Sequence, residues 1–270
     1  MHTELKQPVQ YTLDLDGQSV SLNPVIGQPL TMRYTGAIHC VHCGRKTNKS
    51  FNQGFCYPCF QKLAQCDKCI VSPEKCHYDE GTCREPEWAD AHCQQPHYVY
   101  LANSSGVKVG ITRHTQVPTR WMDQGAVAAL PIFKVNSRKT SGLVEVAFKN
   151  YVADKTSWQK MLKGVAEPVD LKARRDELMA ELVGELDALK QQLGEQAIEA
   201  ISDADVVDID YPVDVYPEKV KSFNLDKTPE VGGVLQGIKG QYLIFDTGVI
   251  NIRKFGGYEV ELESPLLMAS

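Results

Sequence analysis

All nine cysteines of the 270-residue chain lie within 54 residues, from Cys40 to Cys93. The stretch opens with two Cys-x2-Cys pairs, Cys40/Cys43 and Cys56/Cys59, which twelve residues separate. Each pair offers two thiolates from one tight turn, and two pairs complete the tetrahedral coordination of a structural zinc. A disulfide framework is disfavoured, because the N-terminus shows no charged-then-apolar leader and the chain is longer than small secreted scaffolds. The spacing therefore predicts a zinc site built from these four cysteines.

Two residues next to these cysteines favour tight turns. Gly44 follows the first pair, where the backbone is expected to fold back towards the metal and a side chain would crowd it. Pro58 lies inside the second pair and stiffens that turn.

A second group of metal-ligating residues follows directly. Its predicted ligands are the four cysteines Cys66, Cys69, Cys83 and Cys93. Cys76 and His77 are alternatives for two of these positions. Zinc is the expected ion, although four thiolates also suit an iron–sulfur cluster. The sequence thus predicts one or two structural zinc ions.

Composition and charge bound the class of protein. Hydrophobic residues make up 43% of the chain and charged residues 23%, as in ordinary globular proteins. No apolar run approaches the roughly 20 residues of a membrane span, so we expect no membrane partner. The absence of a leader and the abundance of thiols together predict a cytoplasmic protein. The net charge of -5 is uneven. Residues 31–165 carry 18 Lys and Arg against 10 Asp and Glu, which is compatible with a surface that faces phosphates. The oligomeric state does not follow from the sequence.

The chain divides into four predicted parts within an α+β fold. Residues 1–38 alternate short apolar runs with turns and predict a few strands. Residues 39–97 form the zinc-binding module, which has too few apolar residues to fold without metal. Residues 98–164 form a small mixed core, and residues 165–270 combine a long helix with a C-terminal β domain.

The last part has two periodic features. Over residues 169–201, leucines recur at the spacing of one helix face, at Leu178, Leu182, Leu186, Leu189 and Leu193. Packing of this helix on the protein's own core is favoured over a dimerising coiled coil. Residues 231–263 alternate glycines with β-rich runs and predict a bent antiparallel sheet or barrel.

The core begins with a predicted hairpin. Tyr98-Val-Tyr-Leu-Ala indicates a strand, Asn103-Ser-Ser-Gly106 a turn and Val107-Lys-Val-Gly-Ile111 the returning strand. Tyr98 and Tyr100 then point to the same face. Helices are expected over 118–129 and 142–155, the second starting near Thr140-Ser-Gly142 and carrying Glu145.

Four short motifs of the core occur in a characteristic order. They are Tyr98-Val-Tyr100, Lys108-Val-Gly110-Ile-Thr112, Pro118-Thr-Arg120-Trp and a helical Glu145. In this order they resemble the GIY-YIG nuclease core. The chain also contains Gly54-Phe-Cys-Tyr-Pro-Cys59, Cys76-His77, Gly81-Thr-Cys-Arg84, Arg120-Trp-Met-Asp-Gln-Gly-Ala126 and Trp158-Gln-Lys-Met-Leu. With the core motifs, these resemble an uncharacterised bacterial cysteine-rich family, for which no activity is implied.

The superfamily resemblance implies metal-assisted hydrolysis of phosphodiesters. Tyr98 or Tyr100 would help to activate the attacking water, Arg120 would stabilise phosphate charge and Glu145 would bind Mg²⁺ or Mn²⁺. These residue types suit the roles, because a carboxylate is a hard magnesium ligand and a guanidinium matches the oxygens of a phosphate. Gly110 would allow the strand to pack closely on a helix.

The chain also departs from the superfamily pattern. Lys108 replaces the second-motif tyrosine, and an asparagine that often closes the site has no clear counterpart. The residues implied to contact nucleic acid are Lys108, Arg113 and Arg120. Two functions follow from this pattern. One is a zinc-stabilised endonuclease that acts on DNA or RNA with Mg²⁺ or Mn²⁺, and the other is a non-catalytic zinc-dependent adaptor that binds nucleic acid or protein.

Overall fold

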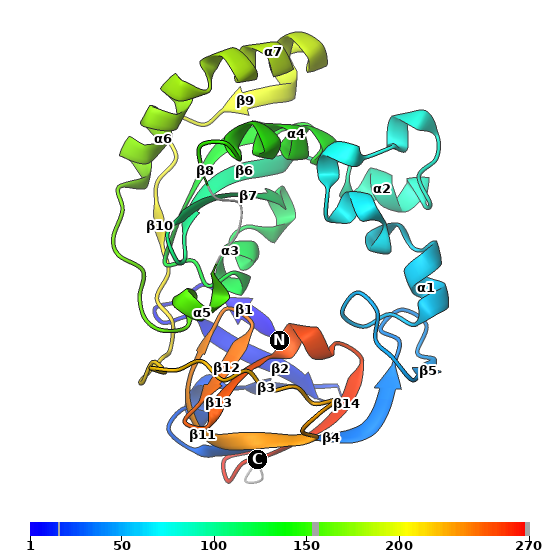
Figure 1. The fold of residues 1–270 in the computed structure, drawn as a ribbon, viewed down its shortest axis with the longest axis vertical. Helices are drawn as coiled ribbons and strands as arrows, with labels where there is room; N and C mark the ends of the chain where they lie inside the picture. The colour runs from blue at the N-terminus through cyan, green and yellow to red at the C-terminus, as the bar shows by residue number, and fades with distance from the viewer. Residues whose placement is uncertain (16, 153–156, 268–270) are drawn as a thin grey trace.

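The structure is a computed structural model that describes residues 1–15, 17–152 and 157–267 (Figure 1). It is a mixed α/β fold whose three sheets are antiparallel. The smallest sheet, in the order β1-β2-β3, uses His2–Glu4, Gln10–Leu15 and Gln18–Ser21. Among the described residues, no helix combines the length and the hydropathy that a membrane span requires.

The largest sheet joins the two ends of the chain. Strand β4 (Pro29–His39) pairs on one side with β11 (Glu230–Lys239) and on the other with β14 (Tyr258–Glu263). The order is β13-β12-β11-β4-β14, with β12 at Tyr242–Phe245, β13 at Gly248–Asn251 and β5 (Lys46–Thr47) added to β4. This pairing is open at β13 and β14, so over the described residues the predicted C-terminal sheet is confirmed and the barrel alternative is wrong.

The core sheet has the order β10-β8-β6-β7, and β9 also pairs with β8. Its strands are β6 (His97–Asn103), β7 (Val107–Arg113), β8 (Ala128–Val135), β9 (Ile198–Ala200) and β10 (Val207–Asp208). The predicted hairpin is confirmed, with Tyr100 opposite Gly110 and Ala102 opposite Lys108. Because β6 lies between β7 and β8, β7 is left as an edge strand.

Helices cover both faces of the core sheet. Tyr100 and Ala102 belong to the hydrophobic cluster that contains Trp121 of α3 (Thr119–Asp123). Val99 and Leu101 pack in another cluster with residues of α4 (Arg138–Phe148). The alternation of side chains along β6 therefore fixes α3 and α4 to opposite faces.

The predicted core helices were placed imprecisely. The helix expected over 118–129 is shorter, because Gly125 adopts a positive φ of 67° and β8 begins at Ala128. The helix expected over 142–155 begins at Arg138, where the Ser137 hydroxyl accepts a hydrogen bond from the Thr140 amide and caps the first turn. The end predicted for this helix, 153–155, lies outside the described residues.

The long helix predicted over 169–201 is wrong in its length. Two helices, α6 (Leu171–Glu181) and α7 (Val183–Leu193), meet at Leu182, whose φ and ψ of -100° and 7° depart from helical values. Gly184 weakens the helix at this point. The predicted leucine face is nevertheless buried in the core cluster of α4, with Leu178, Leu182 and Leu186 fully or almost fully covered.

The cysteine-rich segment contains α1 (Tyr57–Lys62), α2 (Pro86–His92) and several 3-10 turns, and α5 (Trp158–Met161) follows the core. Among the described residues, the hydrophobic clusters include none from 40–96. Ion pairs and hydrogen bonds of side chains hold this segment together instead. Arg84 forms an ion pair with Asp67 at 2.7 Å and donates to the Phe60 carbonyl, while Glu85 accepts from the Ala64 amide.

Candidate functional site

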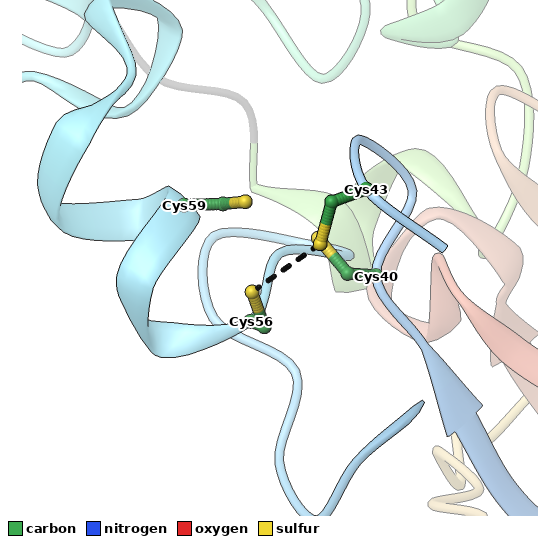
Figure 2. Close-up of side chains that lie close together, drawn as sticks. All are labelled: Cys40, Cys43, Cys56 and Cys59. Carbon is green, nitrogen blue, oxygen red and sulfur yellow. Dashed lines mark hydrogen bonds between the residues drawn. The ribbon is translucent and has the colours of Figure 1, made fainter. Parts of the chain in front are cut away.

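The first two cysteine pairs come together at one point (Figure 2). Cys40 and Cys43 lie in the turn after β4, while Cys56 caps α1 and Cys59 lies in its first turn. Their four sulfur atoms lie within 4.8 Å of one another, and the Cys43 and Cys56 sulfurs are 3.8 Å apart. A tetrahedral zinc with bonds of about 2.3 Å places its sulfur ligands roughly 3.8 Å apart. The cluster is therefore geometrically suited to a structural zinc.

The backbone around Cys40 favours the thiolate that zinc binds. Burial raises the pKa of Cys40, but backbone amides of Cys56, Cys43 and His42 outweigh it and lower the pKa to about 6. Gly44 adopts a positive φ of 69°, and a Cβ atom there would meet no atom within 4 Å. The left-handed conformation is therefore a reason for glycine at this turn, and the expected crowding of a metal by a side chain stays a prediction.

Cys69 is influenced by several other ionisable groups of the cysteine-rich segment. Burial raises the pKa of Cys69 to about 11, and the next contributions come from Asp67, Cys76, Cys93 and Cys83 in that order. Ligand atoms of Asp67, Cys69 and His77 also lie within 4.8 Å of one another, although Asp67 is already paired with Arg84.

Cys66 has a different environment from Cys69. It is buried, and burial raises the pKa of its thiol, while the Asn52 side chain and the Arg84 charge oppose this rise. The Cys83 and Cys93 charges thus act on Cys69 and are not among the leading contributions to the pKa of Cys66, and the predicted ligand set of the second site stays a prediction.

A cavity of about 700 Å³ lies between the cysteine-rich segment and the β7 edge of the core sheet. Ile70, Pro73 and Trp88 line it on one side, and β7 lines it on the other. We call it the basic cleft, because its ionisable lining has more basic than acidic side chains. These are Lys108, Arg113, Arg120, Arg138, Arg253, Asp123 and Glu145, with His92 and His97 beside them.

Most of the predicted site residues line this cleft. Lys108, Arg113, Arg120 and Glu145 all do, although they come from three elements, β7, α3 and α4. Tyr98 is half-buried and is not among the lining residues.

Tyr100 lies behind the cleft wall. It is completely buried, and its hydroxyl donates to Gln124 Oε1 at 3.0 Å. Lys108 Nζ donates to the same oxygen at 2.5 Å. Burial raises the pKa of Tyr100 to about 12 against the opposing effect of the Arg120 charge. Tyr100 therefore stays protonated at neutral pH and acts on the cleft through Gln124.

Gly110 leaves room for the Tyr100 ring. A Cβ atom at this position would meet Tyr100 Cζ and Oη at 2.7 Å. The close approach is to a side chain of the neighbouring strand, which differs from the strand-on-helix packing that the superfamily resemblance implies.

Sequence reasoning missed two arginines of the cleft. Arg138, at the start of α4, donates to the Ile70 carbonyl at 2.6 Å, and its amide donates to the Cys93 carbonyl at 2.8 Å. Arg253 follows β13 and lies 3.6 Å from the Asp123 carboxylate. No local motif marks either residue, because tertiary contacts alone bring them to β7.

His97 is a further member of the cleft wall. Its Nδ1 atom lies 2.7 Å from the Gln95 carbonyl, and its Nε2 atom has no hydrogen-bond partner among the described residues. Burial lowers the pKa of His97 to about 4, so the ring is neutral and Nε2 is a hydrogen-bond acceptor.

These features define a mixed α/β protein with a four-cysteine centre suited to zinc and a basic cleft beside it. Residues 27–260 match the family described as "Protein of unknown function (DUF2797)", and the chain belongs to this family. No curated protein and no solved structure matches the chain. The match spans both cysteine groups and every basic residue of the cleft. It agrees with the resemblance to an uncharacterised family, whereas the GIY-YIG resemblance stays a prediction.

Proposed function

We propose that the protein is a zinc-stabilised nucleic-acid-binding protein that holds the phosphate backbone in the basic cleft. The observation that carries this proposal is the convergence of five basic side chains from separate parts of the chain on one cavity. Guanidinium groups bind phosphate oxygens with paired hydrogen bonds, and clustered cations release the counterions of a nucleic acid.

Within this proposal, the cleft is a candidate endonuclease site. Glu145 would supply a carboxylate to one Mg²⁺ or Mn²⁺ ion, and Arg120 would stabilise charge on the phosphate. The metal would polarise the phosphoryl oxygens, and Lys108 would orient the same group from the other side of the cleft. The location of all three residues on one cavity supports this arrangement.

A non-catalytic adaptor is the second candidate. The observation that favours it is Tyr100, which is buried, stays protonated and bonds to Gln124. A phenol in that state does not accept a proton from water. The adaptor would bind nucleic acid in the same cleft without hydrolysis.

We also propose that a second zinc is held by Cys69, Cys76, Cys83 and Cys93. The charges of Cys76, Cys83 and Cys93 act on the Cys69 thiol, and those of Cys76 and Cys83 act on the Cys93 thiol, which supports the set. Cys66 is left out because it is not among the leading contributions to the pKa of either thiol. This proposal differs from the ligand set that the Cys-x2-Cys spacing predicts.

The binding proposal is tested by fluorescence anisotropy with a labelled oligonucleotide at several salt concentrations. Affinity should fall as salt rises, and Arg120→Ala should weaken binding by about tenfold and flatten the salt dependence. Lys227→Ala is the matched control, because Lys227 is exposed and lies outside the cleft. Binding that is indifferent to salt, or equally weakened by both variants, contradicts the proposal.

Hydrolysis is tested with the same protein, labelled DNA and RNA, and added Mg²⁺ or Mn²⁺. The endonuclease predicts metal-dependent cleavage that Glu145→Gln reduces by at least about 100-fold. Glu181→Gln, at an exposed carboxylate of α6, should cleave like the wild type. Binding without cleavage in either ion identifies the adaptor.

A further inference from the structure

A second cavity of about 770 Å³ adjoins the basic cleft. The two cavities share Gln65, Ile70, Asp123 and Arg253 in their linings. The second cavity lies between β2, the loops that carry the first cysteine cluster, and the segment from β13 to β14. We call it the apolar groove, after the side chains Leu13, Val41, Phe55, Phe255 and Tyr258 that line it. The two cavities thus have part of their lining in common, including Arg253.

The groove presents rings and aliphatic groups that are only partly covered. Phe55, Phe255 and Tyr258 are half-buried, and Val41 is 56% exposed. Phe255 and Tyr258 contact each other edge-on, with ring centroids 5.2 Å apart, and Phe255 also packs against the hydrophobic cluster that holds Tyr100. Partly covered rings of this kind are the surfaces on which nucleobases stack.

The charges of the groove differ from those of the cleft. Among the described residues, Arg253 is the one Lys or Arg side chain in the groove lining, while the carboxylates of Asp14, Asp123 and Glu259 also line it. These carboxylates have partners, since Asp14 lies 2.7 Å from His2, and Glu259 lies 3.6 Å from His39 and accepts from the Thr35 hydroxyl at 2.8 Å. Such a surface does not attract phosphate, but its oxygens can accept from the amino groups of bases.

We propose that the basic cleft and the apolar groove together form one site for single-stranded nucleic acid, with phosphates in the cleft and unstacked bases in the groove. This inference rests on the proposed function and adds the class of substrate. A strand alternates charged phosphates with uncharged aromatic bases, which matches the two adjoining surfaces. A duplex keeps its bases stacked inside, so it can occupy the cleft but not the groove. A lone mononucleotide would use only a fraction of the five basic side chains.

The test compares three ligands on the full-length, zinc-loaded protein. They are a labelled single strand of about 12 nucleotides, the duplex of the same sequence, and a mononucleotide used as competitor. Phe255→Leu keeps apolar bulk but removes the ring, and it should weaken single-strand binding by about tenfold while leaving duplex binding unchanged. Arg113→Ala, in the cleft, should weaken both. Zinc content and thermal unfolding of each variant verify that its fold is retained.

Three results would overturn the inference. They are a duplex that binds as tightly as the single strand, a Phe255→Leu variant that weakens both ligands equally, and a mononucleotide that competes as well as the strand. Duplex binding without single-strand preference leaves the proposed function standing and removes only this inference. Failure of every polynucleotide to bind removes the proposed function itself.

Discussion

At the scale of single residues, Gln124 connects the cleft to the core of the protein. Its Oε1 atom accepts hydrogen bonds from both Tyr100 Oη and Lys108 Nζ. The buried tyrosine therefore fixes the amide, and the amide fixes the ammonium group at the cleft wall. Lys108 is 4% exposed, so its charge is positioned by this contact rather than by solvent. Gln124 thus holds the Lys108 side chain at a defined position in the cleft wall.

Gly110→Ala should destabilise the protein by about 1–3 kcal/mol. The added Cβ would meet the Tyr100 ring at 2.7 Å, so the ring must shift and weaken its bond to Gln124. Urea unfolding measures the change. Gly184→Ala is the control, because a Cβ there meets no atom within 4 Å and alanine favours the α7 helix by about 0.5–1 kcal/mol. Equal effects of the two variants would refute the packing argument.

Lys239 gives a prediction for alkaline pH. The residue is completely buried, donates to the Gly164 carbonyl at 2.9 Å and lies 5.2 Å from the Tyr216 ring centroid. Burial lowers its pKa to about 8, whereas an unfolded lysine titrates near 10.4. Between these values the unfolded chain binds more protons, so the free energy of unfolding should rise with pH by up to about 3 kcal/mol from this group.

This contribution is isolated by comparison with Lys239→Met. Other groups titrate in the same range, but they are common to both proteins. The free energy of unfolding of both proteins is measured by urea unfolding from pH 7 to 10.5. Above pH 8, the value for the wild type should rise relative to that of the variant. Curves that stay parallel would show that burial does not perturb Lys239.

At the scale of elements, the cysteine-rich segment is held together differently from the rest of the chain. Its described residues between 40 and 96 contribute nothing to the hydrophobic clusters. Thiol groups and ion pairs such as Arg84–Asp67 hold the segment together instead. Since this segment forms one wall of the basic cleft, metal loading and the shape of the cleft should be coupled.

Serine variants test the metal sites by elemental analysis of the purified protein. Cys56→Ser should lose one zinc, and Cys76→Ser should lose the other. Cys66→Ser is the control and should keep both. Loss of metal in Cys56→Ser should also expose residues 40–96 to protease, because zinc contributes about 10 kcal/mol or more to the folding of thiolate modules. Equal zinc contents in Cys56→Ser and Cys66→Ser would refute the proposed ligands.

Elements with a strong local pattern could be predicted from the sequence. The hairpin of β6 and β7 and the strand β12 lie where alternation and glycine placed them. The ends of helices could not be predicted from the sequence, because α4 starts at a serine cap and the leucine-rich helix breaks at Leu182. Periodicity reports which face is buried, whereas a cap or a break depends on a few dihedral angles.

At the scale of the whole molecule, strand β4 joins the N-terminal and C-terminal parts of the chain. It lies between β11 and β14, and side chains of β11, β12 and β13 pack in the cluster that holds Tyr100 and Trp121. The core sheet and the C-terminal sheet thus share buried surface. The division of the chain into four domains stays a prediction, but these contacts couple the stabilities of the segments.

Removal of residues 229–270 should therefore abolish cooperative folding of the remaining chain. The truncation exposes both edges of β4 and the buried faces of Tyr100 and Trp121. The free energy lost with these contacts should exceed the roughly 5–15 kcal/mol that stabilises a typical domain. Circular dichroism during urea titration of zinc-loaded protein measures this. A truncated chain with a sharp transition and a native near-ultraviolet spectrum would show that the C-terminal sheet is dispensable.

The sequence by itself determined the four-cysteine cluster and the core hairpin, because both depend on residues close together in the chain. A Cys-x2-Cys turn and a two-residue alternation carry their geometry with them. Only the tertiary structure decided that Arg138 and Arg253 join Lys108 and Arg120 around one cleft. Such contacts form between residues distant in sequence, whose packing is set by the burial of whole sheets and helices and leaves no local pattern.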